Sequence, residues 1–121
     1  MSKGIYNETY FKNNPEEAKS PGILYCVILV NKKTFKRECI KIGITKGTSN
    51  KSVVKRSFGF KGYDVRVQKI VHGTLEEVYY LEQYLHELWS DFRYTAGHKF
   101  GGSTELFELK NEIIQSIPSS C

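Results

Sequence analysis

The pattern of apolar residues along the chain predicts two adjacent strands. Residues 23–30 form an apolar run rich in β-branched and aromatic side chains, and residues 39–45 resume after a polar segment with β-branched residues at alternate positions. This is the pattern of a β-hairpin. In the second arm the period of two places Ile40, Ile42 and Ile44 on one face of the strand. We therefore expect Lys41 to point away from the isoleucines.

Two further segments follow the hairpin. Residues 51–58 are long enough for about two helical turns carrying Lys55 and Arg56. Residues 63–71 alternate again and predict a third strand, whose apolar side carries Val65, Val67 and Val71.

The longest predicted helix begins at Thr74. Thr74 followed by Glu77 matches a capping box, and the helix is expected to run to about residue 92. Glu82 is expected at the border of its buried stripe, where a side chain can reach both core and solvent. The stripe itself consists of residues at spacings of three and four: Val78, Leu81, Leu85, Leu88 and Phe92.

The two ends of the chain complete the predicted fold. Residues 106–117 carry apolar residues with a helical period, although a short strand also fits residues 105–109. Residues 1–21 are polar and end in turn-forming residues, so we expect an N-terminal arm over residues 1–21 and one domain over residues 22–121. The order of elements predicts an α+β domain with a small three-stranded, mainly antiparallel sheet flanked by helices.

The composition narrows the class of protein. With 40% apolar and 26% charged residues, a chain of 121 residues fits a single folded domain. Its longest apolar run has 8 residues, too short to cross a bilayer as a helix. Residues 1–19 lack the apolar centre of a secretory signal, so we expect a cytoplasmic protein without a membrane partner. The three cysteines lack zinc-finger spacing and are expected to be free thiols.

Positive charge is concentrated in one stretch of the chain. Residues 32–69 contain twelve lysines or arginines and only two acids, whereas the rest of the chain is net acidic. Such a concentrated field favours a polyanion such as DNA or RNA, because each neutralised phosphate releases counterions. A solvated basic surface explains the charge equally well.

Two short motifs make the prediction specific. Gly22-Ile23-Leu24-Tyr25 at the start of the first strand and Lys41-Ile42-Gly43-Ile44-Thr45 in the second resemble the two defining motifs of the GIY-YIG nuclease superfamily. Arg56 on a short helix and Glu82 on the long helix are similar in place to the family's arginine and metal-binding glutamate. The phage-type and fungal branch is similar in residues 41–45, 81–86 and 102–107.

The chain departs from the family pattern in three places. Lys41 stands where the second motif usually has tyrosine, Arg56 lies further from Gly43 than in the shortest members, and no histidine or tyrosine follows Arg56 directly. Lys55 could replace Arg56, and Tyr63 is the nearest tyrosine. A literal Gly-Ile-Tyr at residues 4–6 lies too far from the second motif to form a hairpin with it.

The resemblance implies a metal-dependent endonuclease that hydrolyses phosphodiester bonds, in DNA rather than RNA. Its catalytic residues would be Tyr25, Lys41 and Arg56, with Tyr25 and Lys41 both open as the general base. Glu82 would hold one Mg²⁺ or Mn²⁺ ion, since Mg²⁺ prefers oxygen ligands. Further contacts with nucleic acid are expected from Lys46, Lys51, Lys55, Lys61 and Arg66. Supporting positions around the site are Gly43, Thr45, Tyr63, His86 and Glu105.

Two other classes of function stay open at this stage. The chain could be a GIY-YIG-fold module that binds nucleic acid without cutting it, because Lys41 replaces the motif tyrosine. It could also be a small protein whose basic stretch binds an acidic protein surface. A homodimer or a protein partner is open in each case, and the sequence carries no base-reading code.

Overall fold

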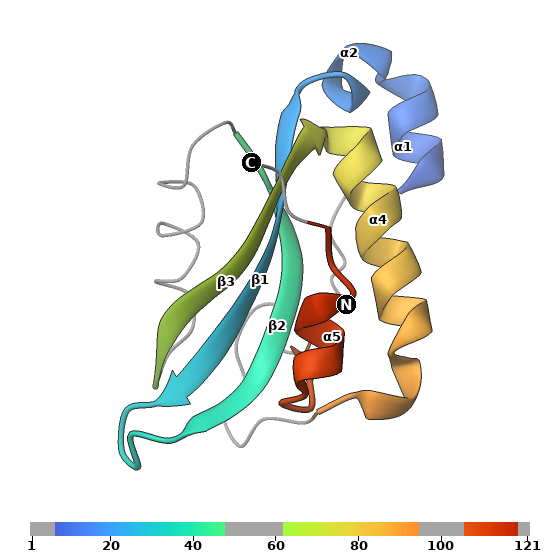
Figure 1. Cartoon of the computed structure of the whole chain (residues 1–121). Helices are drawn as coiled ribbons and strands as arrows, with labels where there is room; N and C mark the ends of the chain where they lie inside the picture. Colours follow the sequence, from blue (N-terminus) through green and yellow to red (C-terminus); the bar gives the residue numbers. More distant parts are fainter. Residues whose placement is uncertain (1–6, 48–61, 95–105, 119–121) are drawn as a thin grey trace.

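The computed structural model describes residues 7–47, 62–94 and 106–118, and every structural statement below refers to these residues. A four-stranded antiparallel sheet in the order β3-β1-β2-β4 forms its centre. The described helices lie on one side of this sheet (Figure 1). The predicted α+β class is confirmed, and the sheet has one strand more than the three we expected.

Strands β1 (Pro21–Asn31) and β2 (Arg37–Lys46) form the predicted hairpin. Directly opposed residues of an antiparallel pair lie on the same face of the sheet. We call one face the tyrosine face; its central residues are Tyr25, Val27, Leu29, Cys39 and Lys41. We call the other the helix face; its central residues are Leu24, Cys26, Ile28, Ile40 and Ile42. Lys41 therefore points away from the isoleucines, as the alternation predicted.

Strand β3 (Tyr63–Thr74) pairs with the other edge of β1 and contains a bulge. The pairing skips Gln68, and one extra residue moves all later side chains to the opposite face. Val65 consequently packs on the tyrosine face and Val71 on the helix face. The prediction that these two valines share one side was wrong for this reason.

Helix α4 (Leu75–Leu88) begins at the predicted capping box. The Thr74 hydroxyl accepts from the backbone N–H of Glu77 at 3.1 Å, and the Glu77 carboxylate accepts from the backbone N–H of Thr74 at 2.9 Å. The helix is shorter than predicted, because it ends before Trp89 and a 3-10 turn, η1 (Ser90–Phe92), follows.

Helix α4 packs against the helix face with its first three turns. Its buried residues are Leu75, Val78, Glu82 and Leu85. A Cβ on Gly22 would lie 2.8 Å from the Cα of Leu75, so glycine at this position allows the helix to start close to β1. The buried stripe begins at Leu75, and Leu88, which was predicted to belong to it, is 48% exposed. Glu82 lies inside the stripe instead of at its border.

The N-terminal arm contains two short helices, α1 (Glu8–Asn13) and α2 (Pro15–Ala18). Phe11 and Ala18 are buried and belong to the core on the helix face. The Phe11 ring meets the ring of Tyr79 on α4 edge-on, with centroids 5.4 Å apart. The arm is therefore part of the packed structure, which its polar sequence did not indicate.

The C-terminal part adds the fourth strand and the last described helix. Strand β4 (Leu106–Phe107) pairs with Ile40 and Lys41 of β2, so the strand alternative for residues 105–109 was the better interpretation. Helix α5 (Asn111–Gln115) buries Ile113 on the helix face. Cys26 and Cys39 are free thiols, and burial raises the pKa of each to about 12. None of the described helices has the length and apolar character needed to cross a membrane.

Candidate functional site

Tyr25 and Gly43 face each other across β1 and β2, and the tyrosine ring lies over the glycine. A Cβ at Gly43 would come within 2.7 Å of the Tyr25 hydroxyl and 2.9 Å of its Cζ. Real side chains do not approach so closely, so only glycine leaves room for the ring at this position. The glycine of the second motif therefore has a steric function for the tyrosine of the first.

Lys41 reaches the same point on the tyrosine face. The same Cβ at Gly43 would lie 3.2 Å from its Nζ, and this Nζ is 5.7 Å from the centroid of the Tyr25 ring, within the range of a cation–π contact. The side chain is 0% exposed and its strand neighbours are Val27 and Leu106. A lysine at this position carries its ammonium group into the buried part of the tyrosine face, beside Tyr25.

The Tyr25 hydroxyl lies where it costs stability. The Tyr25 hydroxyl is buried and makes no hydrogen bond with any of the described residues. An unsatisfied buried polar group costs about 1–3 kcal/mol, and burying an ammonium group costs more unless polar or charged atoms accompany it. Buried polar groups that lower the stability of the fold are typical of functional sites.

A second polar group on the tyrosine face is the carboxylate of Glu38. The pairing of β1 with β2 shifts between Leu29 and Val30, and this bulge turns Glu38 toward Tyr63 and Tyr94. The two tyrosine hydroxyls donate to Glu38 Oε2 at 2.8 Å and 2.7 Å.

These contacts change the chemistry of the two tyrosines. Burial and the hydrogen bond to Glu38 raise the pKa of Tyr94 to about 12 and raise that of Tyr63 as well. One signal of this network is present in the sequence, since Glu38 is one of only two acids in residues 32–69. Tyr63, expected as a supporting residue, is tied to Glu38 and packs in the same cluster as Tyr25.

Glu82 lies on the other side of the sheet from Tyr25 and Lys41. It belongs to the α4 stripe that packs against the helix face, and it is only 4% exposed. Gln83 donates a hydrogen bond to Glu82 Oε1 at 3.3 Å. The structure therefore brings Tyr25, Lys41 and Gly43 together and places Glu82 apart from them.

His86 and Thr45 occupy different sides of the sheet. His86, one turn after Glu82, donates from Nε2 to the carbonyl of Ile42 at 3.0 Å and packs beside the Phe107 ring. It ties α4 to the backbone of β2. Thr45 pairs with Ile23, which belongs to the cluster of the tyrosine face.

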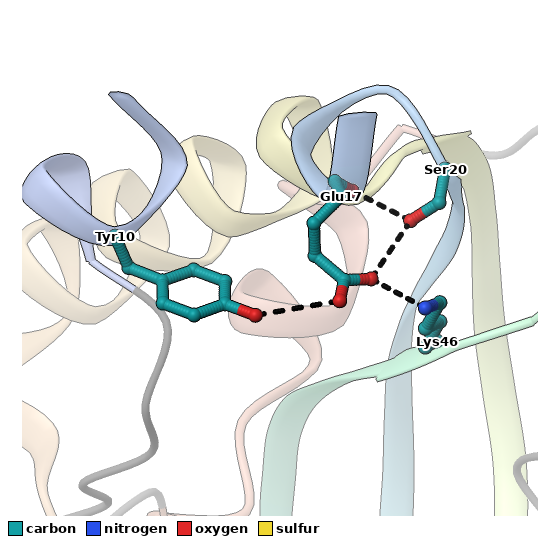
Figure 2. Close-up of polar contacts among 4 residues, drawn as sticks. All are labelled: Tyr10, Glu17, Ser20 and Lys46. Atoms are coloured by element: carbon teal, nitrogen blue, oxygen red, sulfur yellow. Dashed lines mark hydrogen bonds and ion pairs between the residues drawn. The ribbon is translucent and has the colours of Figure 1, made fainter. Parts of the chain in front are cut away.

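Lys46, one of the predicted nucleic-acid contacts, is bound by the N-terminal arm. Its Nζ forms an ion pair with Glu17 Oε1, and Glu17 also accepts hydrogen bonds from the hydroxyls of Tyr10, at 3.3 Å, and Ser20, at 3.4 Å (Figure 2). The hydrogen bond from Lys46 lowers the pKa of Glu17. The pair is partly exposed, with 52% of the lysine side chain accessible. Arg66 is exposed on β3.

Several predicted residues lie outside the described part of the chain: Lys51, Lys55, Arg56, Lys61 and Glu105. Among the residues that are described, no group of three or more His, Cys, Asp or Glu side chains is arranged to hold a metal ion. Glu82, the predicted metal ligand, is among the described residues.

Comparison with known proteins identifies the family. The family model of the T5orf172 domain matches residues 22–120, and the chain therefore belongs to this family. The domain is found in phage and other endonuclease-like proteins. No curated protein and no solved structure matches the chain significantly.

Proposed function

We propose that the protein is a metal-dependent endonuclease that hydrolyses phosphodiester bonds in nucleic acid, with DNA as the preferred substrate. The observation that carries this proposal is the buried pair of Tyr25 and Lys41 over Gly43, because the Tyr25 hydroxyl is buried there without a hydrogen bond to the described residues and a lysine lies beside it. Membership of the T5orf172 family supports the same class of activity.

In this proposal Tyr25 and Lys41 activate the attacking water. Either the Lys41 ammonium stabilises the tyrosinate form of Tyr25, which then accepts the proton, or a neutral Lys41 accepts it directly. The Tyr25 hydroxyl and Lys41 Nζ both lie close to Gly43, so the geometry favours neither alternative. Arg56 would contact the phosphate oxygens, which its planar guanidinium group suits.

A divalent ion would be held by one protein ligand, Glu82, which lies on the opposite side of the sheet from Tyr25 and Lys41. Mg²⁺ prefers oxygen ligands and keeps several waters, so one carboxylate together with substrate phosphate oxygens is a sufficient donor set. Glu82 would supply such a carboxylate, and it is almost fully buried. When bound, the ion would neutralise charge on the phosphate and stabilise the leaving oxygen.

A cleavage assay with a matched pair of variants tests the proposal. Supercoiled, linear and single-stranded DNA are incubated with Mg²⁺ or Mn²⁺ and with wild type, Glu82→Gln or Glu87→Gln. Glu87 lies on the same helix but is exposed, so Glu87→Gln should cut like wild type, whereas Glu82→Gln should not cut. Binding of Mn²⁺, followed by electron paramagnetic resonance, should be weakened by Glu82→Gln alone. Intact DNA with pure wild-type protein and either ion would sink the proposal.

One observation favours a second candidate, a module that binds nucleic acid without cutting it. Glu82 packs toward the helix face, whereas Tyr25 and Lys41 lie on the tyrosine face. A protein of this kind would bind nucleic acid in a salt-dependent way and would leave it intact. The Glu82→Gln variant would bind as tightly as wild type.

A further inference from the structure

The turn between β1 and β2 presents an exposed aromatic side chain. Phe35 is 82% exposed, more than any other large apolar residue in the described part of the chain. The ring therefore contributes little to the burial of apolar surface that stabilises the fold. It is available to a binding partner.

The backbone of Phe35 is also strained. Its φ is 59°, and it is the one residue other than glycine with a positive φ among residues 7–47, 62–94 and 106–118. A bulky side chain disfavours this conformation, which glycine or asparagine adopts at much lower cost. Exposure and strain both argue that the phenylalanine serves a purpose other than folding.

Hydrogen bonds hold the backbone of the turn that carries this ring. The backbone N–H of Phe35 donates to the carbonyl of Asn31 at 2.8 Å, and the N–H of Asn31 donates to the carbonyl of Lys36 at 2.9 Å. The side-chain oxygen of Asn31 accepts from the backbone N–H groups of Lys33 and Thr34. A partner would therefore meet a preorganised turn, which lowers the entropic cost of binding.

Four exposed cationic residues lie within three positions of Phe35 in the sequence: Lys32, Lys33, Lys36 and Arg37. None of them forms an ion pair with another described residue. The outer side of α4 also exposes aromatic residues, Tyr80 and Tyr84, but its charged neighbours there are Glu76 and Glu87. Of these two aromatic surfaces, only the turn has the charge that suits a polyanion.

We infer that residues 32–37 form a second nucleic-acid contact, in which the Phe35 ring stacks on an unpaired base and the four cations contact the adjoining phosphates. This inference rests on the proposed function, since it assumes that the protein binds nucleic acid. Stacking of bases on aromatic side chains combined with cations along the backbone is the common mode of binding single strands. The contact therefore favours single-stranded or locally unpaired DNA over intact duplex.

Fluorescence anisotropy with a labelled oligothymidylate of about 12 nucleotides tests the inference. EDTA is present throughout, so that binding is measured separately from cleavage. Phe35→Leu keeps an apolar side chain but loses the flat ring, and we expect it to bind about tenfold more weakly. Phe35→Tyr should bind like wild type. Tyr84→Leu, which removes an exposed ring from the acidic surface of α4, is the matched control and should change nothing.

Two further variants separate stacking from charge and from folding. The double variant Lys33→Gln/Lys36→Gln should reduce the slope of log K against log salt by about 1.4, or about 0.7 for each lost phosphate contact, while Lys12→Gln/Lys19→Gln should leave it unchanged. Phe35→Gly relieves the strained φ, so it should melt at the same temperature as wild type or higher and still bind weakly.

The outcomes distinguish this inference from the proposed function. Wild-type binding that is unchanged in Phe35→Leu would overturn the inference and leave the nuclease proposal standing. No binding of wild type to any nucleic acid would overturn both. Phe35-dependent binding to phosphatidylglycerol vesicles that is tighter than binding to the oligonucleotide would assign the turn to a lipid surface and overturn the inference.

Discussion

The helix face and the tyrosine face of the sheet are both buried, but they differ in chemistry. The helix face is covered by apolar side chains from α4, α5 and the N-terminal arm, with Glu82 as the buried charged residue described there. The tyrosine face buries the Tyr25 hydroxyl and the Lys41 ammonium group, and it carries the half-buried network around Glu38.

Under the proposed function, this difference separates residues that stabilise the fold from residues that act on the substrate. Apolar contacts on the helix face contribute to the free energy of unfolding in proportion to the area they bury. On the tyrosine face the unsatisfied Tyr25 hydroxyl lowers that free energy, and under the proposed function Tyr25 and Lys41 are the groups that move protons. Substitutions on the two faces should therefore have opposite profiles.

Lys41→Met should give the largest effect and should affect activity alone. We expect cleavage to fall by about 10²–10⁴-fold, the usual contribution of a general acid or base. The free energy of unfolding should change little, because methionine is similar in length to lysine and keeps its apolar stem. Single-turnover cleavage and guanidinium denaturation measure the two quantities. A folded Lys41→Met protein that cuts at the wild-type rate would contradict the assignment of activity to the tyrosine face.

Ile42→Ala should show the reverse profile on the neighbouring residue of the same strand. Ile42 is fully buried on the helix face, and truncating such a residue costs about 2–5 kcal/mol in the free energy of unfolding. Cleavage measured well below the melting temperature should match wild type. If folded Ile42→Ala protein lost cleavage, the separation of the two faces would fail.

Tyr94→Phe should have a smaller effect that depends on pH. The pKa of Tyr94 is raised from 10.0 to about 12, mainly by burial and then by the hydrogen bond to Glu38. Because the pKa in the folded protein is above its unfolded value, this stabilisation is complete below pH 10 and is lost as the pH rises toward 12.

Denaturation curves across that range would test the pH dependence. The wild type should lose stability relative to Tyr94→Phe as the pH rises, so the difference between the two should shrink. Tyr84→Phe, at an exposed position, is the control and should follow wild type. A constant difference between wild type and Tyr94→Phe at every pH would contradict the role of the Glu38 network.

Glu17→Gln should have the smallest effect, at the end of the sheet where the arm binds Lys46. Releasing Lys46 makes one more cation available to phosphate, so we expect binding to DNA to tighten about twofold, with a slightly steeper salt dependence. Glu16→Gln makes the same change in net charge without an ion pair to Lys46 and is the control. Equal effects of both variants would show that only net charge matters.

The local patterns predicted more of the fold than the long-range ones. The alternation around Lys41 and the Thr74–Glu77 capping box depend on neighbouring residues, and both predictions were correct. The bulge at Gln68 and the depth of Glu82 depend on how strands pair and on how α4 rotates against the sheet. Neither can be read from spacing along one segment.

The candidate site was predictable to the same limited extent. The motifs indicated that Tyr25, Lys41 and Gly43 would lie close together, because they lie on paired strands. The contacts of Glu38 with Tyr63 and Tyr94 join residues far apart in sequence, through a bulge that no motif encodes. The positions of Arg56 and Glu105 stay predictions, since both lie outside the described residues.

The N-terminal arm has a consequence for how this domain can be transplanted. The family match begins at residue 22, yet Phe11 of α1 is 2% exposed and packs against Tyr79 of α4. The segment recognised by similarity therefore starts later in the chain than the residues packed into the core. A fusion protein that started at Gly22 would lack the Phe11 ring and would expose the core residues that this ring covers. An engineered chimera would therefore need either the arm or a substitute for it.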